Sequence, residues 1–278
     1  GGVPKFNSDL IKIFDYNDSD GLEQIFEDNK NEIATVVLEP TMYEHPENDF
    51  LKRVRKLVDQ NDSVLILDEI VTGFRFDIGG GQKFFDIKGD LACFGKGMGN
   101  GLPISAITGP SEYMKIFDEL WVSSTNNSEN LSLAGTNAVI NEMQEKKTIL
   151  HCWDIGKKLL EEWNKIVTKF NIDAKMYGYP IRMHLQCFDS KKNESLEMKS
   201  LLLQEMVKQG IFISISGATF ICYSHSKEDI DKTFSALERT CEFIVDKVKN
   251  DNYSEFIEGE LPKKIWSMKL SPIKKRLK

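Results

Sequence analysis

Short apolar runs separated by polar stretches characterise the first part of the chain and predict a buried sheet. IATVVLEP (33–40) and SVLILD (63–68) have the length and the β-branched or aliphatic composition of strands. The apolar positions from Phe50 to Val58 follow helical spacing, and Asn48 and Asp49 stand where they could cap such a helix. A strand, a helix and a strand in this order predict a βαβ unit, whose two strands are parallel.

Two further strands, DLACFG (90–95) and PISAITG (103–109), are predicted on either side of a glycine-rich turn that holds Lys96. Glu39 and Asp68 each stand at the end of one of the earlier strands. In open α/β sheets, ligands bind beyond the carboxyl ends of the strands. We therefore expect the ionisable groups of Glu39, Asp68 and Lys96 to meet at one edge of a mostly parallel sheet.

The pattern changes near residue 145, where amphipathic helices begin to alternate with short strands. The predicted elements are an amphipathic helix from Trp153 to Phe170, a strand IRMHLQCF (181–188), a helix from Leu196 to Gln209, two short strands IFISI (211–215) and TFICY (219–223), and a closing helix. Ser226 and Asp229 have the spacing of a capping box at the start of that last helix. We expect two domains: residues 1–144, and a smaller α+β domain of residues 145–278 that ends in the basic tail LSPIKKRLK.

Composition and charge narrow the classes of function. The chain of 278 residues has a net charge of −7, which disfavours a nucleic-acid-binding surface. Its five cysteines are widely spaced without a CxxC pattern, so they predict neither disulfides nor a zinc site and favour a cytoplasmic location. The four histidines have no metal-ligand spacing, and no apolar stretch reaches the ~18 residues needed to span a bilayer. We expect no metal, no nucleic acid and no membrane partner.

A lysine in a glycine-rich turn has two interpretations besides covalent chemistry. The segment GDLACFGKG resembles a nucleotide-binding phosphate loop, but Gly89 and Gly95 enclose five residues instead of about four, and Gly97 replaces the hydroxyl residue after the lysine. The segment also follows the acidic strand VLILDE, whereas a phosphate loop would precede it. The other interpretation is a structural lysine that reaches water. Asp68 at a neighbouring strand end favours a functional role for Lys96, because a buried carboxylate needs a cationic partner.

Two motifs, LILDEIVTGFR and DLACFGKGMGNGLPISAITG, resemble the class III aminotransferases of fold type I, in the branch that contains glutamate-1-semialdehyde aminomutase. The segments GGVPK…DYND, EP and SSTNNSENLSLAG follow the same branch in the same order, so the resemblance extends over nearly the whole chain. It implies an α/β fold, in which the mostly parallel sheet of a large domain, here incomplete, precedes a smaller carboxy-terminal α+β domain. It also implies pyridoxal 5'-phosphate (PLP) as the cofactor and a homodimer as the assembly.

The resemblance assigns roles to individual residues. Lys96 matches the lysine that forms a Schiff base with PLP and then moves a proton, and a confined site would favour the neutral amine that this chemistry needs. Asp68 matches the carboxylate that pairs with the pyridine nitrogen, and Ile70 matches a residue that packs on one face of the ring. Thr125 matches a threonine that binds the cofactor phosphate across the subunit interface, with a capping threonine as the alternative. Glu39 matches a glutamate near the substrate, and a structural role for it is equally open.

Departures from the family bear on the substrate. Val71 stands where many class III transaminases have a glutamine, and GIFISISGATFICYSHSKEDI lacks the carboxy-terminal arginine that holds a dicarboxylate, so a 2-oxoglutarate-dependent transaminase is disfavoured. The segment GNGLP and the pair Asn126 and Asn127 depart from the aminomutase branch in turn. We expect an amino-group transferase that acts on a small aldehyde or ketone. Conversion of glutamate 1-semialdehyde to 5-aminolevulinate is the alternative within the family, and a catalytically inactive relative that serves in binding or assembly is the alternative from another class.

The resemblance places two parts of the cofactor site before Gly1. They are a glycine, serine and threonine cup for the phosphate and an aromatic residue for the second ring face; such a cup binds phosphate through backbone N–H groups. We expect the chain to be the carboxy-terminal part of a protein about 150 residues longer, with an inactive remnant as the alternative.

Overall fold

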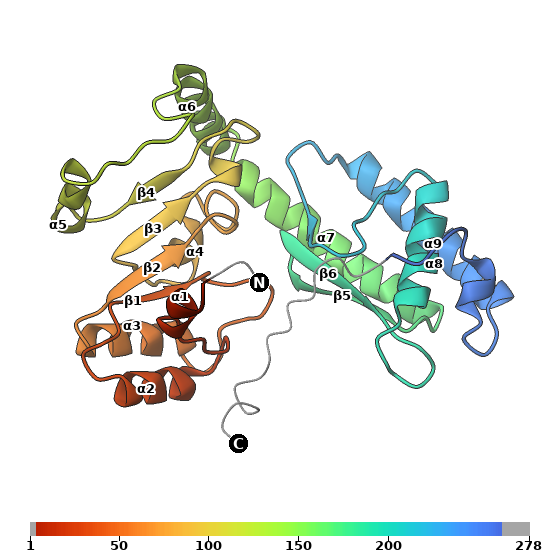
Figure 1. Cartoon of the computed structure of the whole chain (residues 1–278). Helices are drawn as coiled ribbons and strands as arrows, with labels where there is room; N and C mark the ends of the chain where they lie inside the picture. The colour runs from red at the N-terminus through yellow and green to blue at the C-terminus, as the bar shows by residue number, and fades with distance from the viewer. Residues whose placement is uncertain (1–3, 263–278) are drawn as a thin grey trace. The chain divides into compact units, whose positions relative to one another are not determined.

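The computed structural model describes residues 4–262, which divide into two units with a boundary between Glu145 and Lys146 (Figure 1). Unit 1 precedes this boundary and unit 2 follows it, and each unit has its own sheet. The basic tail LSPIKKRLK lies outside the described residues. No helix formed by residues 4–262 is both long and apolar enough to cross a lipid bilayer.

Unit 1 is built on a four-stranded sheet in the order β1-β2-β3-β4. Strands β1, β2 and β3 are parallel, which confirms the predicted βαβ unit, and β4 is antiparallel to β3. The elements of unit 1 are α1 (Lys5–Asp9), α2 (Ser19–Asp28), β1 (Thr35–Leu38), α3 (Phe50–Gln60), β2 (Val64–Asp68), α4 (Gly80–Phe84), β3 (Leu91–Phe94), the 3-10 helix η1 (Lys96–Met98), β4 (Ala106–Thr108), α5 (Ser111–Met114), the 3-10 helix η2 (Lys115–Asp118) and α6 (Asn130–Glu145).

Helices α2 and α3 lie next to each other and cover one face of the sheet (Figure 1). Their apolar residues pack with those of β1 and β2 and with Ile87, which precedes β3, in one cluster: Leu22, Phe26, Val36, Phe50, Leu51, Val54, Leu57, Val58, Leu65, Leu67 and Ile87. Successive strand residues point to opposite faces, so Val36 is buried whereas Val37 is 56% exposed. Among the described residues, the opposite face of β1 is therefore open.

The prediction that a side chain caps α3 is wrong. Asp49 precedes the helix with a left-handed backbone (φ 57°), and its side chain makes no capping hydrogen bond. Its carboxylate instead lies 3.5 Å from Lys52 Nζ. A left-handed residue cannot hold its side chain over the first turn in the way that an extended N-cap residue does.

Unit 2 is built on a three-stranded antiparallel sheet in the order β5-β6-β7. Its elements are α7 (Thr148–Lys169), β5 (Ala174–Tyr179), β6 (Arg182–Cys187), α8 (Leu196–Lys208), β7 (Thr219–Phe220), α9 (Lys227–Lys247) and the 3-10 helix η3 (Tyr253–Phe256). Helix α9 begins with the predicted capping box, in which the Ser226 and Asp229 side chains each bond to the backbone N–H of the other.

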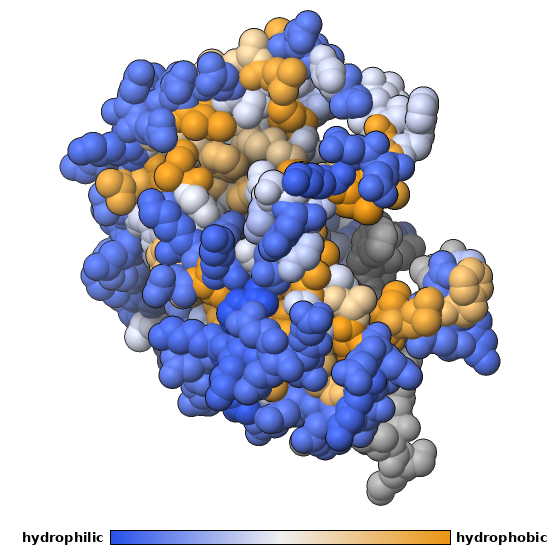
Figure 2. All heavy atoms as spheres, turned by 90° about the vertical axis from the view of Figure 1, so that its left-hand side faces the viewer, coloured by the Kyte–Doolittle hydropathy of each residue, from blue (hydrophilic) through white to orange (hydrophobic). Residues whose placement is uncertain are grey.

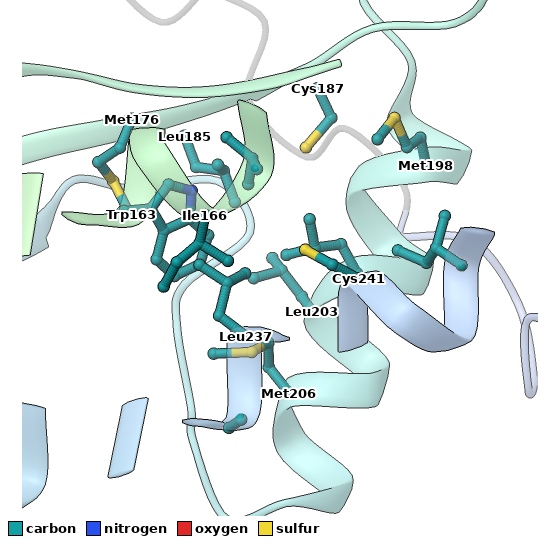
Figure 3. Packing of buried hydrophobic residues seen from close by; sticks show 14 of the residues in the cluster. Trp163, Ile166, Met176, Leu185, Cys187, Met198, Leu203, Met206, Leu237 and Cys241 are labelled. Carbon is teal, nitrogen blue, oxygen red and sulfur yellow. The ribbon is translucent and has the colours of Figure 1, made fainter. Parts of the chain in front are cut away.

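The core of unit 2 lies between its sheet and its three long helices. Figure 3 shows Trp163 of α7 beside Met176 and Leu185 of the sheet, with Leu203 of α8 and Leu237 of α9 completing the cluster. All five side chains are at most 5% exposed. This core gives unit 2 its own source of hydrophobic stabilisation.

Two strand predictions in unit 2 need correction. IFISI (211–215) forms no strand, and TFICY contributes only Thr219–Phe220. The isoleucines of IFISI pack against the core while Phe212 is 83% exposed, so the segment has the side-chain alternation of a strand without its backbone pairing. Strand β5 was not predicted, and it pairs with β6 over its whole length.

Candidate active site

The parallel strands of unit 1 bring three predicted site residues to one edge of the sheet. Glu39 follows the last residue of β1, Asp68 ends β2, and Lys96 begins η1 two residues after β3 ends. Leu38 pairs with Leu67 and Asp68 pairs with Cys93, so the three strands end at nearly the same level. The edge predicted from the sequence is thus present in the fold.

Asp68 places a half-buried carboxylate at this edge. Its Oδ1 accepts a hydrogen bond of 3.0 Å from the N–H of Ile70, which fixes the start of the segment that we call the aspartate turn (residues 68–74). Cys93 is its partner in register, and burial together with the charge of Asp68 raises the pKa of the Cys93 thiol. The thiol therefore stays neutral beside Asp68 at neutral pH.

Lys96 lies in a second segment, the lysine turn (residues 95–101). Its backbone is left-handed (φ 42°), and the N–H of Asn100 donates to its carbonyl at 3.0 Å. The Lys96 side chain is exposed, so residues 4–262 do not supply the confined site expected for its amine.

Ile70 borders the lysine turn. A Cβ atom at Gly95 would lie 3.8 Å from Ile70 Cγ2, an ordinary van der Waals contact. An apolar side chain thus lies between the strand end that carries the carboxylate and the turn that carries the amine.

Thr125 lies elsewhere, in an exposed turn between η2 and α6. The helix that follows this turn, α6, contacts η1 in the lysine turn and packs closely on Leu102 just after it, since a Cβ atom at Gly135 would lie only 2.1 Å from Leu102 Cδ1. The surrounding segment is rich in exposed apolar side chains: Ile116, Leu120, Trp121, Val122, Leu131 and Leu133. Figure 2 shows apolar residues on this side of the molecule at the height of α5 and α6, above a hydrophilic region at the height of α2 and α3.

The residues at the edge carry the chemical groups that PLP would need. Asp68 offers an anion for the ring nitrogen, Ile70 an apolar surface for the ring, and Lys96 an amine for the aldehyde carbon. The close approach of the aspartate turn to the lysine turn brings these groups together in one small region. Glu39 is half-buried at the neighbouring strand end.

One residue that the sequence did not single out is Glu69. It is fully buried (0% exposed) directly beside Asp68, and its carboxylate accepts three hydrogen bonds. The signals in the sequence were its place next to Asp68 and the glycine run at residues 79–81. Neither signal shows by itself that these segments meet.

The fold of the chain is also found in proteins of known structure. In overall structure the chain resembles the PLP internal aldimine form of the FumI protein of Sphingopyxis sp. MTA144, with a TM-score of 0.81 and 19% identity over 90% of this chain and 62% of that chain. The family model for class III aminotransferases (Aminotransferase class-III) matches residues 2–241. The chain belongs to this family.

The names of two curated relatives state different activities. The glutamate-1-semialdehyde 2,1-aminomutase of Methanococcus maripaludis (strain C6) is 30% identical over 255 residues, which cover 85% of this chain and 59% of the relative. The 3-aminobutyryl-CoA aminotransferase of Cloacimonas acidaminovorans is 30% identical over 250 residues, which cover 86% of this chain and 60% of the relative. The chain thus spans less than two thirds of the length of each.

Proposed function

We propose that the full-length protein is a PLP-dependent class III amino-group transferase that acts on a small aldehyde or ketone. The proposal is supported by the positions of Asp68 and Lys96 at the ends of the neighbouring strands β2 and β3, in a chain that belongs to the class III family. PLP, when bound, supplies an electron sink for the carbon that carries the amino group. The protein supplies binding, orientation and proton transfer.

Each residue then has a defined task. The Asp68 carboxylate holds the ring nitrogen in its protonated form, and Ile70 supports one face of the ring. The Nζ of Lys96 would hold the cofactor at its aldehyde carbon, and the free amine would accept and return the proton of the substrate carbon. Glu39 borders the substrate. Because its pKa is raised, the Cys93 thiol beside Asp68 stays neutral.

The partner we propose is a second copy of the chain. Trp121 is 95% exposed within the apolar segment around Thr125, and burying such a segment against another subunit would remove a large apolar area from water. In this arrangement, Thr125 of one subunit binds the cofactor phosphate of the other. The protein is expected in the cytoplasm, where free thiols persist.

A second candidate is the intramolecular exchange of glutamate-1-semialdehyde 2,1-aminomutase. The name of the Methanococcus relative and the apolar Val71 favour it. The name of the Cloacimonas relative favours an intermolecular transfer instead. A catalytically inactive relative that serves in binding or assembly is the alternative of another class.

Absorbance of the full-length protein tests the proposal. We expect a visible band from bound PLP that is lost in Lys96→Ala and retained in Lys115→Ala, which removes another exposed lysine of unit 1. Formation of 5-aminolevulinate from glutamate 1-semialdehyde without a second amino donor would select the aminomutase, and transfer of an amino group from another amine to an aldehyde or ketone would select the transferase. A colourless full-length protein would support the inactive relative and overturn the proposal.

A further inference from the structure

Glu69 is a buried carboxylate that the proposed cofactor contacts do not use. Its backbone N–H donates to the carbonyl of Cys93 at 2.9 Å, so the β2–β3 ladder continues one residue beyond Asp68. Consecutive residues of an extended chain point in opposite directions. The Asp68 carboxylate lies at the open edge, whereas the Glu69 side chain is fully buried.

The carboxylate of Glu69 joins the aspartate turn to helix α4. Its Oε2 accepts from the N–H of Gly81 at 2.7 Å and from the Thr72 hydroxyl, and its Oε1 accepts from the N–H of Gln82 at 2.7 Å. These N–H groups belong to the first turn of α4 and have no acceptor within the helix. Gly80 has a φ of 83°, and a Cβ atom there would lie 2.7 Å from the carboxylate. The backbone at the start of α4 is therefore shaped around the Glu69 carboxyl group.

The aspartate turn also packs on the lysine turn. The Glu69 carbonyl accepts from the N–H of Gly73 at 2.8 Å, which closes the aspartate turn. A Cβ atom at Gly73 would lie 2.5 Å from the ring of Phe94, and one at Gly97 would lie 3.5 Å from the Gly73 carbonyl oxygen. The contacts thus fall on both sides of Lys96 in the sequence. A shift of the aspartate turn would move Asp68 relative to the lysine.

We propose that Glu69 is the positioning residue of the cofactor site. Its buried carboxylate fixes the aspartate turn to α4 and thereby sets the placement of the Asp68 carboxylate relative to the Lys96 amine. The proposal rests on the proposed function, because it assigns Glu69 a role in holding the same cofactor. Glu69 itself touches neither cofactor nor substrate.

The test compares Glu69→Gln with Asp90→Asn in the full-length protein. Asp90 is a matched control, since its carboxylate accepts from the N–H of Leu65 at 2.7 Å and pairs with Arg55 at 2.8 Å, but it lies at the opposite end of the sheet. Both variants should lower the melting temperature. Only Glu69→Gln should weaken PLP binding, by about 10-fold to 100-fold as for residues that orient metal ligands, and should shift the pH midpoint of the bound cofactor's absorbance.

The outcomes separate this proposal from the proposed function. A wild-type protein that binds no PLP overturns the proposed function, and the positioning role falls with it. A wild-type protein that binds PLP, with a Glu69→Gln variant that loses stability but keeps the wild-type affinity and pH midpoint, overturns the positioning role alone. If Glu69→Gln does not fold, Thr72→Val takes its place, because it removes one hydrogen bond to the same carboxylate. Thr72→Val should then weaken PLP binding and shift the pH midpoint of the absorbance by smaller amounts, and a variant with wild-type values of both would overturn the positioning role.

Discussion

Asp68 and Glu69 are adjacent carboxylates at the end of β2, and their different surroundings suit them to different roles. Asp68 is half-buried and accepts from the N–H of Ile70 within its own turn, so its carboxylate can serve a ligand. Glu69 is fully buried, and its oxygens are bonded to the Thr72 hydroxyl and to the first turn of α4. Burial of an ion is costly unless hydrogen bonds replace its hydration. The first carboxylate is therefore suited to binding and the second to holding the backbone.

His184 in β6 predicts a pH dependence of stability. Burial, and then the charges of Arg182 and Lys199, hold its pKa below the ordinary value of 6.5. The unfolded chain therefore binds this proton at a higher pH than the native state does. The stabilising contribution of the neutral ring is complete above about pH 6.5 and is lost as the pH falls from there through the native pKa.

Urea unfolding at about pH 7.5 and about pH 5.5 measures this effect. We expect the urea midpoint of the wild type to fall between the two conditions and to fall less in His184→Gln. The control is His45→Gln at an exposed position of unit 1, which should keep the wild-type difference. An unchanged pH difference in His184→Gln would contradict the assignment.

At the scale of elements, we predict that glycine stabilises helix α7 more than alanine does at position 156, which is the reverse of the usual order. Alanine is normally better than glycine inside a helix by about 1 kcal/mol. In α7, however, a Cβ atom at 156 would lie 2.0 Å from the carbonyl oxygen of Pro180, between β5 and β6. That atom belongs to the backbone, so relief requires moving the hairpin.

We expect Gly156→Ala to lower the free energy of unfolding by about 1–3 kcal/mol, the usual cost of overpacking. Lys157→Ala, at the exposed neighbouring position of α7, should stay within about 0.5 kcal/mol of the wild type. Denaturant titration of both variants checks the prediction. A Gly156→Ala variant as stable as the wild type would show that α7 and the hairpin do not approach so closely.

The elements that the sequence predicted are those whose pattern is local. β2 and the capping box of α9 needed only a short apolar run or a fixed spacing of polar residues. β5, by contrast, reads AKMYGY and is defined by its pairing with β6, which no local pattern reveals. IFISI is the converse case, since it has the composition of a strand and makes no ladder.

In the candidate site, too, some positions follow from local patterns and others depend on contacts between distant segments. The positions of Asp68 and Lys96 were predictable because parallel strands must bring their carboxyl ends to one edge. Glu69 was not, because its role depends on a five-residue helix, GGQKF, that lies more than ten residues away and has no helical periodicity. Contacts of this kind appear only when the chain is folded.

At the scale of the whole molecule, the apolar segment around Thr125 predicts that the protein self-associates. We expect the wild type to sediment as a dimer and Trp121→Ser to shift toward monomer, with weaker PLP binding because Thr125 would no longer reach the neighbouring subunit. Phe212→Ser, which changes an 83% exposed aromatic residue of unit 2, should leave the dimer intact. A Trp121→Ser variant with wild-type dimer affinity would exclude this interface.

Chemical trapping of the cofactor tests most directly whether the edge of the unit 1 sheet holds PLP. The full-length protein is reduced with borohydride, digested, and analysed by mass spectrometry for a lysine that carries the pyridoxyl group. Our account predicts the modification on Lys96, in the peptide from Gly89 to Lys115, and its loss of occupancy in Asp68→Ala. Modification of a different lysine, or none in a protein purified with excess PLP, would contradict it.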